Sequence, residues 1–138
     1  MLKVVIDTNV FISSFFGGLP REIIDLWKDE KIIICLSQEI IEEYVEVLHR
    51  LDVDNNEIKK LTRLFAECYN SIFTIETISL DLVQDDPDDN KFIECAVALE
   101  SKIIISGDKH LLNIHKYIDI HIVSPREFIE QFFKDTAK

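Results

Sequence analysis

The sequence predicts an α/β fold, a three-layer α/β/α sandwich with a central parallel sheet. Segments with a strand pattern alternate along the chain with segments of helical periodicity, and this order is typical of a parallel sheet connected by helices. Nearly every expected strand is a continuous apolar run, as in strands that are buried on both faces of a sheet. The 138 residues, 47% of them hydrophobic, suit a single domain spanning residues 1–138 with one core.

The first half of the chain contains three expected strands and three expected helices. The strands are apolar runs rich in Ile and Val, at residues 2–6, 32–36 and, with a weaker pattern, 72–75. The helices are expected at residues 21–28, 38–51 and 55–70. Pro20 stands where it can start the first of them, because its fixed φ suits a first helical turn. Ser37 can cap the second with its hydroxyl group.

The second half opens with a turn-forming stretch at residues 85–89, followed by a helix that extends through Phe92 to Leu99. Two further apolar runs, 103–105 and 120–123, are expected strands, and a short helix over 109–114 lies between them. Gly107 ends the first of these strands. The final helix is expected to begin after Ser124, because Ser124, Pro125 and Glu127 have the spacing of a capping box with Pro at the first helical position.

Composition limits the classes of protein that the chain can belong to. The longest apolar runs are far too short to span a bilayer, and the N-terminus has no signal-peptide layout, so we expect a soluble cytoplasmic protein without membrane association. Cys35, Cys68 and Cys95 are widely spaced among apolar neighbours and are predicted to be reduced core residues. Fifteen Lys and Arg against 26 Asp and Glu give a net charge of −11, which disfavours tight non-specific binding to nucleic acid.

Several acidic residues fall where a parallel α/β fold places its ligand site, beyond the carboxyl ends of the strands. Asp7 and Asp108 follow two expected strands, Asp88 and Asp89 precede a helix, and Glu43 lies at the edge of the apolar face of another helix. Each has a structural alternative: a turn former for Asp7, an N-cap for Asp89 or Asp108, and a solvated helix face for Glu43. Three separate segments nevertheless bring acids to one predicted edge, and Glu43 adds a fourth if it points inward.

Clustered carboxylates repel one another unless a cation lies among them. Hard oxygen ligands select Mg²⁺ or Mn²⁺, and such a site can activate water for displacement at phosphorus. The residues therefore suggest phosphodiester hydrolysis. A phosphate-accepting receiver domain or an aspartyl-phosphate phosphatase is a weaker alternative. A phosphatase requires a second Asp two residues after the first, where this chain has Asn9, and a receiver domain requires a lysine at the end of a late strand.

Four short motifs resemble those of PIN-domain proteins, in the same order and with similar spacing. They lie at residues 5–12, 36–44, 89–96 and 106–112, and the likeness continues through residues 123–128. The resemblance implies a PIN-like fold in which a set of acids binds Mg²⁺ or Mn²⁺: Asp7, Glu43, Asp89 and Asp108. It also implies that Asn9 orients the site and that Ser106 occupies a small hydroxyl position. Whether Asp88 or Asp89 fills the third position stays open.

The size and the motifs look most like the subgroup of PIN-domain proteins that act as toxins in prokaryotic toxin–antitoxin pairs. That resemblance implies RNA cleavage, inhibition by a small antitoxin protein and homodimer formation. A PIN fold that serves as an RNA-binding or regulatory module is the alternative.

The net charge raises the question of how such a protein would hold RNA. Lys91 and Lys109 lie within two residues of a proposed acid, and we expect them, with Arg126, to contact RNA phosphates at the mouth of the site. Ordinary solvated lysines are the alternative. The acidic residues of the outer helix faces are expected to lie away from that mouth: Glu39, Glu42 and Glu46.

Overall fold

The computed structural model describes residues 1–83 and 87–133, which form a six-stranded sheet and the helices that pack against it. The strands are β1 (Leu2–Ile6), β2 (Ile32–Ser37), β3 (Ser71–Thr74), β4 (Ile103–Ile105), β5 (Lys116–Tyr117) and β6 (Ile120–Val123). Their order across the sheet is β3-β2-β1-β4-β6-β5, and every neighbouring pair is parallel except β5 with β6. The predicted α/β fold with a central, mostly parallel sheet is confirmed.

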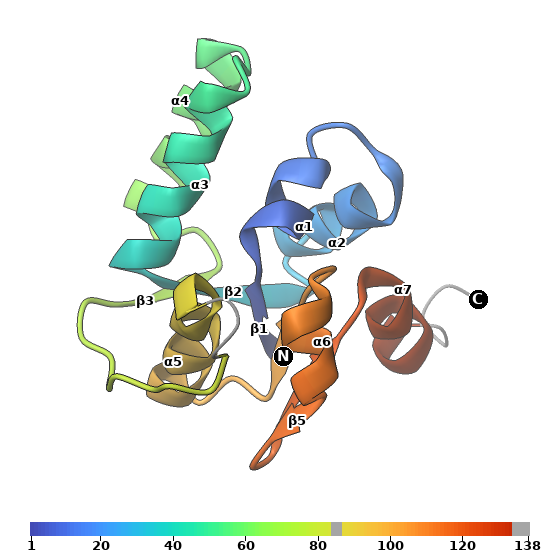
Figure 1. The fold of residues 1–138 in the computed structure, drawn as a ribbon. Coiled ribbons are helices and arrows are strands. Elements are labelled where there is room, and N and C mark those ends of the chain that lie inside the picture. The colour runs from blue at the N-terminus through green and yellow to red at the C-terminus, as the bar shows by residue number, and fades with distance from the viewer. Residues whose placement is uncertain (84–86, 134–138) are drawn as a thin grey trace.

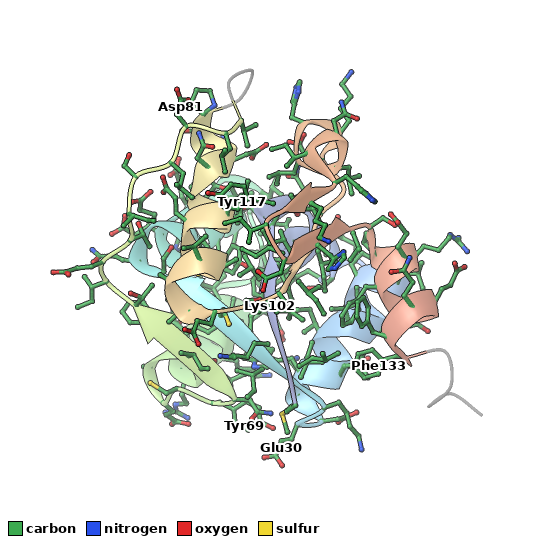
Figure 2. The ribbon with its side chains drawn as sticks, turned by 90° about the horizontal axis from the view of Figure 1, so that it is seen from below. Glu30, Tyr69, Asp81, Lys102, Tyr117 and Phe133 are labelled. Atoms are coloured by element: carbon green, nitrogen blue, oxygen red, sulfur yellow. The ribbon has the colours of Figure 1, made fainter. Side chains whose placement is uncertain are left out.

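Helices cover both faces of the sheet. They are α1 (Thr8–Ser13), α2 (Gly18–Lys28), α3 (Gln38–Arg50), α4 (Asn55–Ala66), α5 (Asn90–Leu99), α6 (Lys109–Ile114) and α7 (Pro125–Phe128). A 3₁₀ turn, η1 (Pro87–Asp89), precedes α5, and a π-helical turn, η2 (Ile129–Phe133), follows α7. Helices α5 and α2 lie on opposite sides of the central strands (Figure 2), and both contact β2. Helices α3 and α4 form an arm that extends away from the sheet (Figure 1).

The core lies between the central strands and the helices on either side. Every residue from Val4 to Ile6 is fully shielded from solvent, whichever face its side chain points to, as expected for a strand covered on both sides. The largest buried side chains come from the helices: Phe11, Trp27, Tyr44, Phe92 and Phe128. Continuous apolar runs in the sequence therefore correspond to strands in the middle of the sheet.

The helix caps follow the predicted chemistry. The Ser37 hydroxyl accepts a hydrogen bond from the backbone N–H of Ile40 at the start of α3. Ser124 and Glu127 form the expected reciprocal capping box, with Pro125 in the first turn of α7. These caps end strands β2 and β6 and turn the chain into the next helix at the same edge of the sheet.

Several details differ from the prediction. Helix α1 was not expected, because its apolar run reads as a continuation of the first strand; Asp7 starts it by accepting a hydrogen bond from the Val10 N–H. Helix α2 begins before Pro20, and α4 ends at Ala66 rather than near residue 70. The short strand β5 was also missed, because it forms a two-residue hairpin partner of β6 with no alternating pattern of its own.

The cysteine prediction is correct for two residues and wrong for the third. Cys35 and Cys95 are buried free thiols, and burial raises their pKa values to about 11 and about 12. Cys68, in contrast, is exposed. It lies in the turn after α4 with a positive φ of 54°. Its side chain is therefore not on the apolar face that a helix continuing to residue 70 would have had.

Helix α5 also holds the segment that leads into it from β3. The Asn90 side chain accepts hydrogen bonds from the N–H groups of Leu82 and Val83 and donates one to the carbonyl of Pro87. Glu94 accepts one from the Leu80 N–H at 2.7 Å. Part of the expected turn at 85–89 lies outside the described residues. Among the residues that the structure does describe, no helix is long and apolar enough to cross a membrane.

Candidate active site

The site begins where β1 and β4 end side by side. These strands pair in parallel with Ile6 opposite Ile105, so the next residues, Asp7 and Ser106, are brought together by backbone register. The Asp7 N–H donates to the Ile105 carbonyl at 3.0 Å, and the Ser106 hydroxyl donates to the Asp7 carboxylate. Both side chains are buried. Register alone therefore fixes an acid and a hydroxyl group at the carboxyl edge of the sheet.

The Asp7 carboxyl group is buried, and each of its two oxygens accepts a hydrogen bond, Oδ2 from the Ser106 hydroxyl group. Its exposed fraction is 2%, and its other oxygen, Oδ1, accepts from the Val10 N–H at 2.9 Å. Burial raises the pKa of Asp7 above its ordinary value, and the nearby Asp108 carboxylate raises it further, while the hydrogen bonds from Ser106 and Val10 oppose the rise. A negative charge at this place is costly unless a cation compensates it.

Asp108 joins this strand-end cluster through Ser106. Its N–H donates to the Ser106 hydroxyl oxygen at 2.9 Å, and its Oδ1 accepts from the His110 N–H at 2.7 Å. The expected capping role of Asp108 is therefore present at the start of α6. Ser106 bridges the two acids, donating to one side chain and accepting from the backbone of the other. The sequence identified all three residues.

Helix α3 brings Glu43 to the same edge. The neighbouring Tyr44 is fully buried, its hydroxyl group donates to the Ile6 carbonyl, and its ring stacks on Phe11 with centroids 4.1 Å apart. These contacts fix α3 over the end of β1, beside Asp7. The Thr8 hydroxyl then donates to Glu43 Oε1. Glu43 therefore points into the site rather than lying on a solvated helix face.

Asp88 and Asp89 enter from η1, at the start of α5. Asp89 occupies the N-cap position of α5, but its side chain makes no capping hydrogen bond to the helix. The buried Asn90 holds this turn instead, through the Pro87 carbonyl. The capping alternative for Asp89 is therefore not what the structure shows, and Asp89 lines the site. Asp88 is exposed beside it.

These elements surround a polar hollow of about 410 Å³. Six carboxylates line it: Asp7, Glu43, Glu46, Asp88, Asp89 and Asp108. Asn9 lies at its exposed rim, as expected from its position in the first motif. Among the described residues that line the hollow, the only Lys or Arg is Arg50. The hollow thus concentrates negative charge with little cationic compensation from its own walls.

The donor chemistry of the hollow fits a hard divalent cation, because carboxylate and amide oxygens are the ligands that Mg²⁺ and Mn²⁺ prefer. The side chains are not drawn together into a complete ligand set: within residues 1–83 and 87–133, no group of three or more His, Cys, Asp or Glu is placed to hold a metal ion. Glu43 is instead engaged by its protein neighbours, and the acids Asp7 and Asp108 are fixed by Ser106.

The cations of the site differ from those expected. Lys91 does not line the hollow; its ammonium group lies 2.5 Å from Glu43 Oε2, and only 11% of its side chain is exposed. Lys109 is exposed on the first turn of α6, next to Asp108. Neither it nor Arg126 is among the described residues that line the hollow. Side-chain direction decided these outcomes, and sequence spacing does not report it.

Two residues that line the hollow were not predicted to do so. Glu46 was expected on an outer face but lines the hollow, and Arg50 was not considered. A helical wheel carries the signal for Arg50, because it lies seven residues after Glu43 and therefore on the same helix face. Glu46 lies between them, three residues after Glu43, where side chains are neighbours on a helix surface.

Acids that follow β1 and β4, that precede α5 and that lie on α3 meet at the carboxyl edge of a mostly parallel sheet. This arrangement defines a class of α/β proteins with a polyacidic site. The chain belongs to the PIN-domain family, whose model matches residues 3–110. That span includes every acid that lines the hollow. PIN domains are generally nucleases and usually use divalent metals, which separates this chain from the receiver and phosphatase alternatives.

One relative extends the likeness beyond the family match. An uncharacterized protein of Methanocaldococcus jannaschii, MJ1680, is 38% identical over 149 residues, and the alignment covers 96% of this chain and 93% of that protein. The similarity therefore includes the elements that follow residue 110, among them β6 and the capped helix α7.

Proposed function

We propose that this protein is an endoribonuclease that depends on Mg²⁺ or Mn²⁺ and hydrolyses RNA phosphodiester bonds in the acidic hollow. The observation that carries the proposal is the convergence of Asp7, Asp89 and Asp108 on one hollow of a PIN-domain protein. The pKa of the buried Asp7 is raised, which means that its ionised form lacks compensation within the protein alone. A bound cation supplies that compensation.

The residues of the chain divide into holding and orienting roles. Asp7, Asp89 and Asp108 are the proposed ligands of the ion, which when bound would activate water and stabilise charge at phosphorus. The Ser106 hydroxyl group orients both acids: it donates to the Asp7 carboxylate and accepts from the Asp108 N–H. Asn9 is exposed at the rim of the hollow, and its proposed role is to donate to a substrate oxygen. Glu43 is the fourth acid predicted from the motifs, and it forms an ion pair with Lys91.

Substrate capture at a net charge of −11 requires local attraction. We propose that Arg50, which lines the hollow, pairs with a phosphate there, and that Lys109, exposed next to Asp108, does the same. Six acidic neighbours oppose these cations, so the affinity for RNA should be modest and should depend on the divalent ion.

The direct test is cleavage of a single-stranded RNA by the purified protein. We expect cleavage with Mg²⁺ or Mn²⁺, and complete loss of it in excess chelator. Asp108→Asn should be inactive, whereas Glu39→Gln, an exposed acid on the same helix as Glu43, should retain full activity as the matched control. Cleavage that persists in chelator, or equal activity of the two variants, would contradict the proposal.

The resemblance to toxins supports two further proposals about partners. A small antitoxin protein would inhibit the ribonuclease, and the active form would be a homodimer. Light scattering during size-exclusion chromatography tests the dimer. Co-expression with the product of a neighbouring gene, followed by the RNA assay, tests inhibition; full activity of a stable complex would exclude it.

A further inference from the structure

Both oxygens of Glu43 have partners on side chains of the protein. Oε1 accepts from the Thr8 hydroxyl group, and Oε2 forms an ion pair with Lys91 Nζ at 2.5 Å. The pair is shielded, with 11% of the Lys91 side chain and 28% of the Glu43 side chain exposed. The charge of Glu43 is already paired with an ammonium group, so it has little to gain from a metal ion. The oxygens of Asp7, in contrast, accept from neutral donors, a backbone N–H and a hydroxyl group.

The location of Lys91 makes this pairing necessary. Lys91 is the second residue of α5, where the aligned peptide dipoles present partial positive charge. An ammonium group is unfavourable there and would also lose hydration on burial. The Phe92 ring lies 5.4 Å from Nζ and compensates only in part. The Glu43 carboxylate is the group that compensates the rest.

We infer that Lys91 is a resident cation of this site, which neutralises Glu43 and withholds it from divalent-metal coordination. The inference rests on the proposed function, since it concerns how the hollow holds its ion. Lys91 then excludes a second divalent ion from the Glu43 side of the hollow, and the ion is bound by Asp7, Asp89 and Asp108. Lys91 is a positioning residue, because it acts on the ion through Glu43.

This role predicts a specific pattern of charge dependence. In the native protein, Lys91 and Glu43 cancel, so removing both should leave the field at the ion nearly unchanged. Removing only the ammonium group releases a fourth carboxylate beside the ion. Removing only the carboxylate leaves a cation among the remaining acids, where it repels the ion or takes one of its ligands. If Glu43 were a metal ligand, removing both Lys91 and Glu43 would instead weaken the binding of the ion.

The experiment is a calorimetric titration of Mn²⁺ into four metal-free proteins: the parent, Lys91→Met, Glu43→Gln and the double variant. We expect Lys91→Met to bind Mn²⁺ about 10-fold more tightly and Glu43→Gln to bind about 10-fold more weakly, the scale on which groups around a metal ligand act. The double variant should lie within about 3-fold of the parent, because the two charges are removed together. Lys91→Arg, which keeps the cation, should also remain close to the parent.

A double variant that loses about 100-fold in Mn²⁺ affinity would show that Glu43 is a ligand and overturn the inference. Unchanged affinity in Lys91→Met would also overturn it. Thermal unfolding of each variant checks folding, and the double variant replaces a buried charge pair with neutral groups of similar size, so that it remains testable if a single variant unfolds.

The RNA cleavage assay separates this inference from the proposed function. The expected Mn²⁺ pattern without cleavage by the parent contradicts the proposed function and supports the role of Lys91. Metal-dependent cleavage combined with a double variant that cannot bind Mn²⁺ contradicts the role of Lys91 alone. Failure of all four proteins to bind Mn²⁺ contradicts both.

Discussion

The two sides of the acidic hollow are built by different means. On the strand side, Asp7, Ser106 and Asp108 follow the ends of β1 and β4, and the pairing of Ile6 with Ile105 sets their positions. On the helix side, Glu43 is positioned by its own contacts with the Thr8 hydroxyl group and the Lys91 ammonium group. The strand side is therefore fixed by backbone geometry, and the helix side by interactions between side chains that a single substitution can rearrange.

Under the proposed function, we expect the two sides to have different functions. A rigid pair of acids with a shared hydroxyl group suits a permanent metal-binding position, because little reorganisation accompanies binding. A side chain in an ion pair suits the adjustment of charge around that position. Changes on the strand side should therefore affect chemistry most, and changes on the helix side should affect electrostatics and stability.

Asp7→Asn should produce the largest effect. The substitution removes the charge of a proposed metal ligand while keeping an oxygen that can accept from the Val10 N–H, so the fold should persist. We expect the rate of RNA cleavage to fall by at least about 100-fold, with circular dichroism unchanged. An unfolded variant would show instead that Asp7 serves chiefly as the N-cap of α1.

Ser106→Ala should come next. It removes the donor to Asp7 and the acceptor for the Asp108 N–H, and loss of such an orienting group typically costs about 10- to 100-fold in metal affinity or activity. The free energy of unfolding should fall by about 1–2 kcal/mol, because the partly buried Asp108 N–H loses its partner. Ser13→Ala, at an exposed position of α1, is the control and should change neither quantity. Equal behaviour of the two variants would contradict the bridging role.

The Lys91–Glu43 pair should show a coupling free energy of about 1–2 kcal/mol in urea unfolding with chelator present, since the pair is shielded but not fully buried. The cycle uses Lys91→Met, Glu43→Gln and both together. The Lys102–Asp119 pair, with 57% and 60% of its side chains exposed at a separation of 2.6 Å, is the matched control and should couple more weakly because water screens it. A similar coupling free energy in both pairs would show that the Lys91–Glu43 pair is no stronger than a solvent-exposed ion pair.

The pH dependence of stability distinguishes the two sides further. Because the folded pKa of Asp7 is raised, the unfolded chain releases this proton at lower pH than the folded one does. Asp7 therefore favours folding most at pH values below its unfolded pKa, and its contribution declines as pH rises through the folded pKa. Without metal, Asp7→Asn should gain stability relative to the parent as pH rises above the ordinary aspartate value of 3.8 and through the raised folded pKa. A constant difference across that range would place Asp7 in a solvated environment.

Arg50→Ala should have the smallest effect. Arg50 is exposed at the wall of the hollow, so its loss should weaken RNA binding only a few-fold and reduce the slope of log affinity against log salt by about one. Mn²⁺ affinity should stay close to that of the parent. Arg63→Ala on α4, an exposed cation that does not line the hollow, is the control. Identical salt slopes for both variants would remove Arg50 from substrate binding.

The sequence alone determined the sheet, the caps and the strand side of the site. Apolar runs such as Val4–Ile6 identify central strands because burial on both faces demands them. Parallel strands end at one edge, so Asp7, Ser106 and Asp108 follow from their places directly after β1 and β4. Here local pattern and backbone geometry are sufficient.

Only the tertiary structure decided how the side chains on the helix side of the hollow are positioned and which partner each charged side chain has. The sequence predicted that Lys91 contacts RNA phosphates and did not single out Arg50, yet Lys91 is shielded against Glu43 and Arg50 lines the hollow. The direction of a long side chain depends on which helices meet and on which carboxylate lies within reach, and neither is encoded by spacing along one segment. The register of a parallel sheet is a backbone property that sequence patterns report, whereas an ion pair between α3 and α5 exists only after the two helices have packed.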